Sequence, residues 1–102
     1  MIIYNVTINV EESAHNEWLD YMKNEHISDV MNTGCFIDYT FSRIITRQEG
    51  ETGITYAIQY KCKTMGEYDN YQTNFASALQ KEHTKKFEGK FYAFRTLLEE
   101  VE

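Results

Sequence analysis

The segment IIYNVTINV, residues 2–10, alternates between apolar and polar side chains almost without interruption. Successive side chains of a β-strand point to opposite faces, so alternation with a period of two predicts a half-buried strand. The row expected to face a core holds Ile2, Tyr4, Val6, Ile8 and Val10, and the opposite row holds Ile3, Asn5, Thr7 and Asn9.

Three further segments show the same alternation, at residues 35–47, 53–62 and 90–98. The sequence QEGETG, residues 48–53, is rich in glycine and polar side chains. A segment of this kind between two alternating runs predicts a hairpin loop. The chain is therefore expected to contain four strands, of which the middle two form a hairpin.

Two amphipathic helices are predicted in the remaining segments, because their apolar side chains recur at spacings of three and four. Ser13 is the N-cap candidate of the first helix, and Gly34 is suited to end it in the left-handed conformation. Thr64 and Glu67 form a capping box at the start of the second helix. Gly89 stands beyond the end of that helix.

The predicted order is therefore strand, helix, strand, strand, helix, strand. Two right-handed crossovers around a central hairpin give the ferredoxin-like βαββαβ fold of the α+β class. We expect a four-stranded antiparallel sheet with two helices on one face, and a single domain over residues 1–102.

Composition excludes several classes of function. The chain carries a formal net charge of −6, which repels phosphate backbones and argues against nucleic acid as a partner. No basic leader and no long apolar stretch is present, so neither a signal peptide nor a membrane span is expected, and the default compartment is the cytoplasm. Cys35 and Cys62 share the predicted core face and are expected to be reduced thiols.

The sheet face opposite the helices has no covering layer in this fold. It would carry several apolar side chains if one row of the last strand faces that way. Exposed apolar patches of this kind often mark interfaces, and twofold dimers are the commonest oligomers. We therefore expect a homodimer through the open sheet face, with a solvated face as the alternative. The relevant row is Tyr92, Phe94, Thr96 and Leu98.

Several motifs together resemble one known family. They are MIIYNVT at residues 1–7, Trp18 followed by His26, LQKEH at residues 79–83 and GKFYAFRTLL at residues 89–98. On these motifs the chain resembles the bacterial family named domain of unknown function 4286. That resemblance implies a dimeric α/β barrel, in which two ferredoxin-like sheets pack face to face. Relatives in that superfamily include cofactor-independent monooxygenases, haem-degrading enzymes and muconolactone isomerases, so the fold implies no single chemistry.

His26 is the best single candidate for a catalytic side chain. It lies on the apolar stripe of the first helix, one turn after Met22 and two turns after Trp18. A buried imidazole is held neutral by desolvation and can take a proton from a phenol or an enol. The alternative is a core histidine that only satisfies its own hydrogen bonds. Trp18 and Met22 would wall a ligand pocket beside it or pack into the core.

Four tyrosines are predicted on the helix-facing side of the sheet. Phenol groups gathered beneath a helix can bind a polar ligand or stabilise developing charge. They can also satisfy one another at the edge of the core. The four ligand-binding candidates are Tyr4, Tyr39, Tyr56 and Tyr60.

The other two histidines are expected to play structural parts. His83 is interpreted as a partner of the dipole at the end of the second helix, and His15 as an exposed residue. The two helices should run antiparallel, so His26 and His83 are expected about 25–30 Å apart, at opposite ends of the helix layer. No metal site is predicted, because no ligand spacing resembles a known metal motif.

Three classes of function remain open. The first is a small-ligand-binding or regulatory barrel, with an aromatic compound as its ligand. The second is an enzyme that acts without a cofactor on an aromatic or quinone-like compound, as a monooxygenase or an isomerase, with His26 as acid or base. The third is a purely structural interaction domain. An open pocket beside His26 would favour the first two.

Overall fold

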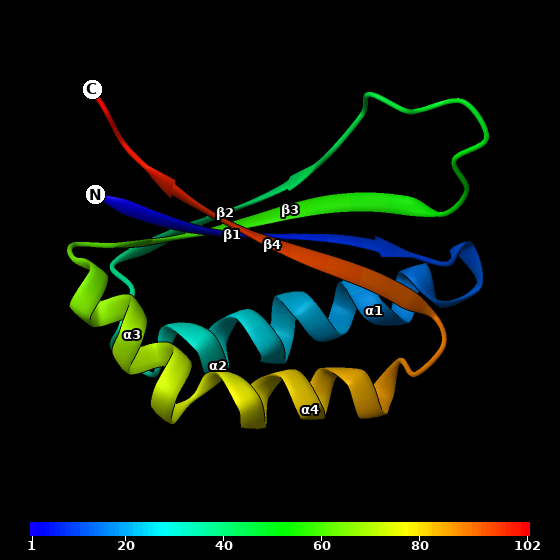
Figure 1. Cartoon of the computed structure of the whole chain (residues 1–102). Coiled ribbons are helices and arrows are strands. Elements are labelled where there is room, and N and C mark those ends of the chain that lie inside the picture. The colour runs from blue at the N-terminus through cyan, green and yellow to red at the C-terminus, as the bar shows by residue number, and fades with distance from the viewer.

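The computed structural model describes all residues from 1 to 102 and confirms the predicted fold class. One antiparallel sheet with the strand order β2-β3-β1-β4 is covered on one face by helices (Figure 1). The strands are β1 (Ile2–Val10), β2 (Asp38–Arg43), β3 (Ile54–Cys62) and β4 (Phe91–Glu99). The helical segments are η1 (Glu12–Ala14), α1 (His15–Tyr21), η2 (Met22–His26), α2 (Ile27–Met31), α3 (Met65–Asn74) and α4 (Ala76–Lys86).

The predicted alternation sets the two faces of the sheet. β1 pairs with β3 on one side and with β4 on the other, and Tyr4 stands opposite Tyr60. The even-numbered side chains of β1 face the helices and form one hydrophobic core with them. The largest fully buried side chains in that core are Trp18, Met22, Ile58, Val10, Val30 and Cys62.

The first helical stretch is not one regular helix. A 3-10 turn precedes it, and Ser13 bonds to the Glu11 carboxylate instead of capping α1, so the predicted cap is wrong. A π-helical turn, η2, then separates α1 from α2, and the Ile27 N–H bonds to the carbonyl of Met22 five residues earlier. Such single π turns inside α-helices occur frequently at functional sites, and this one ends at His26.

The second predicted helix is broken at Phe75, whose φ of −129° and ψ of −37° are not helical. Thr64 caps α3 as predicted, since its Oγ1 accepts the Glu67 N–H at 3.3 Å. α3 descends from the sheet edge, and α4 then runs back beneath the sheet beside the first helical stretch (Figure 1). Only α4 therefore lies alongside that stretch.

The face opposite the helices carries the apolar row expected from β4. The register places Phe94 opposite Thr7 and Tyr92 opposite Asn9. Tyr92 is 59% exposed and Phe94 is 56% exposed in the single chain. The edge strand β2 is shorter than predicted, because residues after 43 leave the sheet in the long hairpin loop (Figure 1).

Both cysteines are buried and unpaired, as predicted. The Cys62 thiol donates to the carbonyl of Thr64, and the Asn70 amide donates to the Cys35 sulfur at 3.4 Å. Among the helices, none combines the length and apolar character that crossing a membrane requires.

Candidate functional site

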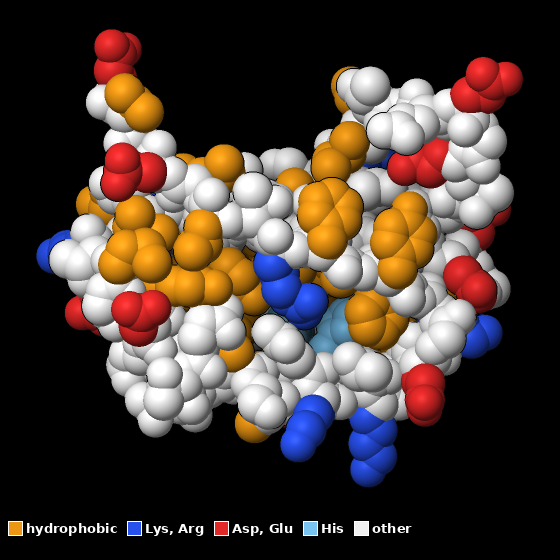
Figure 2. Space-filling view, viewed as in Figure 1, with side chains coloured by type: hydrophobic (Ala, Val, Ile, Leu, Met, Phe, Trp, Pro, Cys, Tyr) orange, Lys and Arg blue, Asp and Glu red, His pale blue; other side chains and the backbone are white.

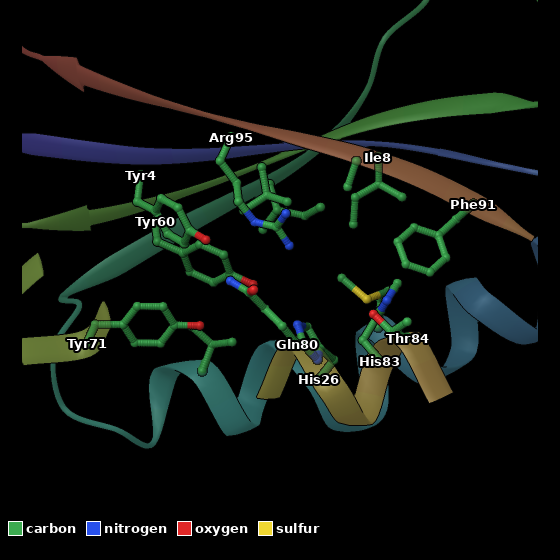
Figure 3. A pocket seen from close by; sticks show the side chains of 15 residues that line it. Tyr4, Ile8, His26, Tyr60, Tyr71, Gln80, His83, Thr84, Phe91 and Arg95 are labelled. Atoms are coloured by element: carbon green, nitrogen blue, oxygen red, sulfur yellow. The ribbon is translucent and has the colours of Figure 1, made fainter. Parts of the chain in front are cut away.

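A cavity of about 40 Å³ lies between the helix-facing side of the sheet and the helices η2, α2 and α4. Figure 3 shows its side chains converging from β1, β3 and β4 above and from the helices below. At about 10–15 Å³ for each water, it has room for about three water molecules. Its main polar lining residues are Tyr4, Tyr60, Tyr71, His26, His83 and Arg95.

His83 is held by a hydrogen bond that joins the two helical stretches. The indole Nε1–H of Trp18 donates to Nε2 of His83 at 2.9 Å, and both side chains are buried. An indole N–H can only donate, so this His83 nitrogen must be unprotonated and the neutral ring carries its proton on Nδ1. Burial, assisted by the nearby His26 and Arg95, lowers the pKa of His83 to about 4. The ring is therefore neutral at neutral pH.

His26 presents a ring without a hydrogen-bond partner in the protein. It lies edge-on to His83, with ring centroids 5.4 Å apart, and tilted to Tyr21 at 5.8 Å. Burial lowers the pKa of His26 below its usual 6.5, against the opposing effects of Asp29 and Glu82. A neutral imidazole offers one donor and one acceptor to the cavity.

The predicted separation of His26 and His83 is wrong. It assumed one continuous second helix, but the break at Phe75 leaves α4 alone beside the first helical stretch. His83 lies seven residues after the start of α4, and His26 lies five residues before the end of α2. At 1.5 Å per residue, antiparallel segments place both near the middle of the layer. His83 does lie in the last turn of α4, as predicted, but its ring is neutral and buried in the cavity wall, so it is not the dipole partner that was expected.

Three phenols line the sheet side of the cavity. Tyr4 and Tyr60 stand opposite each other on β1 and β3, with ring centroids 6.1 Å apart, and Tyr71 from α3 lies 5.8 Å from Tyr4. None of the three hydroxyl groups bonds to another protein group. Burial raises the pKa of Tyr60 and of Tyr71, so both phenols are neutral donors.

The other candidates from the sequence take different places. Met22 lines the cavity. Trp18 and Tyr56 are not in the cavity lining and pack against each other, with ring centroids 5.1 Å apart. Tyr56 also bonds to Nε2 of His15 at 2.7 Å, which makes His15 half-buried and not exposed as expected. Tyr39 faces the same way as Tyr60 but lies on the edge strand β2, outside the cavity lining, and it is 43% exposed.

Arg95 is the site residue that sequence reasoning missed most clearly. It belongs to the inward row of β4, opposite Val6, and its side chain enters the space between sheet and α4 (Figure 3). It forms no ion pair and no side-chain hydrogen bond in the structure. Figure 2 shows a histidine at the bottom of a hollow, with a basic side chain at its edge. A charge between Ala93 and Leu97 on the inward row is the signal that could have identified it.

The arrangement supports two kinds of chemistry. Neutral phenols and an arginine can bind a polar or anionic ligand, and a neutral histidine can accept a proton from a weak acid. The structure brings no group of three or more His, Cys, Asp or Glu together as metal ligands. The Nε2 lone pair of His83 is already engaged by Trp18.

Solved structures with the same fold cover nearly the whole chain. An ethyl tert-butyl ether d (ethd) family protein from Bacillus halodurans C-125 is 18% identical, with a TM-score of 0.68 over 99% of this chain and 100% of that one. SnoaB, a cofactor-independent oxygenase from Streptomyces nogalater, is 10% identical, with a TM-score of 0.66 over 99% and 94%. A dimeric ferredoxin-like protein from an uncultured marine organism is 12% identical, with a TM-score of 0.67 over 98% and 97%.

At these identities the likeness extends to the fold alone. Among curated proteins, no sequence matches this one. The family model does match, and it covers residues 1–101, which is almost the entire chain. The motifs at both ends of the chain and the ferredoxin-like sheet agree with that match. The protein therefore belongs to the family described as Domain of unknown function (DUF4286).

Proposed function

We propose that the protein binds a small aromatic or quinone-like compound in the cavity between its sheet and its helices. One observation carries this proposal. Several polar side chains converge on a single cavity without a hydrogen-bond partner in the protein. They are Tyr4, Tyr60, Tyr71, His26, Gln80 and Arg95.

The polar atoms of these side chains meet solvent at the cavity, because none of them is fully buried without a partner. A core that served only stability would fill this space with apolar side chains. Water can satisfy these groups in the free protein, and a ligand can satisfy them when it replaces that water. The opposite wall, with Ile8 and Phe91, offers the apolar surface that ligand pockets require.

Size sets a condition on the ligand. The present cavity of about 40 Å³ is smaller than an aromatic ring needs, since an engineered cavity of about 150 Å³ accommodates benzene. Arg95 is exposed, and neither Arg95 nor Gln80 is held by a side-chain hydrogen bond. Rotation of these two side chains would open the cavity toward solvent without moving the backbone.

Thermal unfolding with phenol and 2-naphthol tests this proposal. A compound that binds only the folded state at ten times its Kd raises Tm by about 6 °C in a domain of this size. His26→Gln is expected to retain the fold and lose this rise, because it changes the ring that faces the cavity. His15→Gln is the matched control, since it removes a histidine outside the cavity. Absence of any rise in the wild-type protein would contradict the proposal.

A second candidate is an enzyme that uses no cofactor. The observation that favours it is the placement of neutral His26 and positive Arg95 on the same cavity. His26 would take a proton from an enolisable aromatic substrate, and Arg95 would stabilise the resulting enolate. The similarity to SnoaB agrees with this candidate at the level of the fold.

Proton abstraction can be measured directly. Wild-type protein is expected to accelerate deuterium exchange at the acidic carbon of 2-tetralone in D₂O, followed by proton NMR, and His26→Gln should return the rate to background. Binding of 2-naphthol without accelerated exchange would reject the enzyme and leave the binding protein.

We also propose that the open sheet face packs against a second copy of the chain. Tyr92 and Phe94 are large, apolar and more than half exposed on that face. A protein of the same fold is described as dimeric, which supports this arrangement. Sedimentation equilibrium at micromolar concentration should give a dimer, and Phe94→Glu should give a monomer. A wild-type monomer would contradict the interface and favour a solvated face.

A further inference from the structure

The charge that lines the cavity is positive although the whole chain is acidic, while the carboxylates of Asp29 and Glu82 act on His26 from outside that lining. Its formal net charge is −6, yet none of the 15 residues that line the cavity is an aspartate or a glutamate. Arg95 is the one permanently charged side chain among them. Because Arg95 forms no ion pair, its charge is not neutralised within the protein.

The surface beside the cavity has the same sign. A shallow groove along α4 shares Gln80 and Thr84 with the cavity and carries Lys81 and Lys85 at its edge. One carboxylate, Glu88, also lines this groove. Figure 2 shows basic side chains projecting from the helix below the hollow. A local excess of positive charge at a concave site attracts anions and raises their rate of association.

The hydrogen-bond donors inside the cavity suit an anion as well. The neutral phenols Tyr60 and Tyr71 have no partner in the protein and can donate to a negative oxygen. Arginine binds a carboxylate with two parallel N–H donors, a geometry that a lysine cannot reproduce. The apolar side of the cavity, at Phe91 and Ala93, is left for the body of the ligand.

On the basis of the proposed ligand-binding function, we infer that the ligand is an aromatic carboxylate whose charged group is bound by Arg95. The carboxylate replaces the solvent that now hydrates the guanidinium, and the ring enters the space that Arg95 leaves when it turns toward the ligand. Arg95 thereby determines the ligand class.

Isothermal titration with benzoate and with benzyl alcohol tests this inference, because the two probes share a ring and differ in charge. Benzoate should bind wild-type protein more tightly than benzyl alcohol does. Arg95→Gln should weaken benzoate binding by about 10-fold or more, and it should change benzyl alcohol binding far less. Arg95→Lys should restore part of the loss. Arg95 is exposed, so these variants are expected to fold.

Arg43→Gln is the matched control. It removes the same charge from β2, at the opposite edge of the sheet, and should keep the wild-type affinity for benzoate. Equal binding of both probes, insensitive to Arg95→Gln, would overturn the inference and leave the proposed function standing. Binding of neither probe at millimolar concentration would contradict both.

Discussion

Replacement of His83 by glutamine should change how the stability of the protein depends on pH. In the folded chain the neutral His83 ring accepts the Trp18 N–H at 2.9 Å. Protonation makes both ring nitrogens donors, so this hydrogen bond is lost. The titratable and charged groups that face the ring are His26, Arg95 and Tyr21, and none of them supplies a negative charge at neutral pH.

The magnitude follows from the lowered pKa. His83 has a pKa of about 4 in the folded protein against 6.5 for an unperturbed histidine, so between these values the unfolded chain binds more protons. The free energy of unfolding should therefore fall as pH decreases from about 6.5 to 4, by up to about 1.4 kcal/mol per unit and about 3 kcal/mol in total. The contribution is present above pH 6.5 and is lost as pH falls through 4.

Glutamine removes this dependence and keeps an acceptor for the indole. Its side-chain oxygen can bond to Trp18 N–H, but it does not titrate. Loss of the flat ring, which packs edge-on against Phe91 at 4.5 Å, should cost about 1–2 kcal/mol at pH 7. The difference in free energy of unfolding between the wild-type protein and His83→Gln should then shrink or reverse by pH 4. The lowered pKa of His26 contributes a smaller change of the same sign to both proteins.

Urea unfolding at pH 7, 6, 5 and 4 measures this difference. Trp18 is the single tryptophan, so its fluorescence reports on the environment of the bond itself. Gln80→Ala changes a neutral neighbour on α4 and should retain the wild-type slope. If the wild-type and His83→Gln stabilities run parallel across this range, His83 does not lose a proton on folding, and the reasoning from burial is refuted.

Three further predictions concern the fold. Gly53→Ala should lower the free energy of unfolding in urea by at least about 2 kcal/mol, because φ is +75° there and a Cβ would lie 2.7 Å from the Val10 carbonyl oxygen. A loss below about 0.5 kcal/mol, on the order of a neutral surface change, would show that the loop relaxes. Thr64→Ala should cost about 1 kcal/mol in the same assay by removing the cap of α3, and an unchanged midpoint would argue against that cap. Thiol titration of the denatured, unreduced protein should find Cys35 and Cys62 both free, whereas no free thiol would mean that they form a disulfide.

The strands were predictable because their signal is local. Alternation in residues 2–10 and in the last strand places each side chain on a face, and the register of β1 with β4 confirms the row that contains Tyr92 and Phe94. The Thr64 cap was predictable for the same reason, since it depends on groups three residues apart. The lengths of the strands were harder to predict. The second strand was expected to continue to residue 47, but β2 ends at Arg43.

The site was only partly predictable. His26 and Met22 were expected beside a pocket because they share a helical stripe, and the structure lines a cavity with both. Tyr39 shares the face of Tyr60, but parity does not tell how far the helix layer extends over an edge strand. His83 was missed because its partner, Trp18, lies 65 residues away and no local pattern records that bond.

The sequence by itself determined the order of the elements, the two faces of the sheet and the exposed aromatic row, since each depends on spacing along a few neighbouring residues. The tertiary structure alone decided the break at Phe75, the π turn before Ile27 and the meeting of His26 with His83. It also decided that Arg95 enters the cavity. These features depend on the packing of distant segments against one another, where the combined fit of side chains outweighs local helical preference.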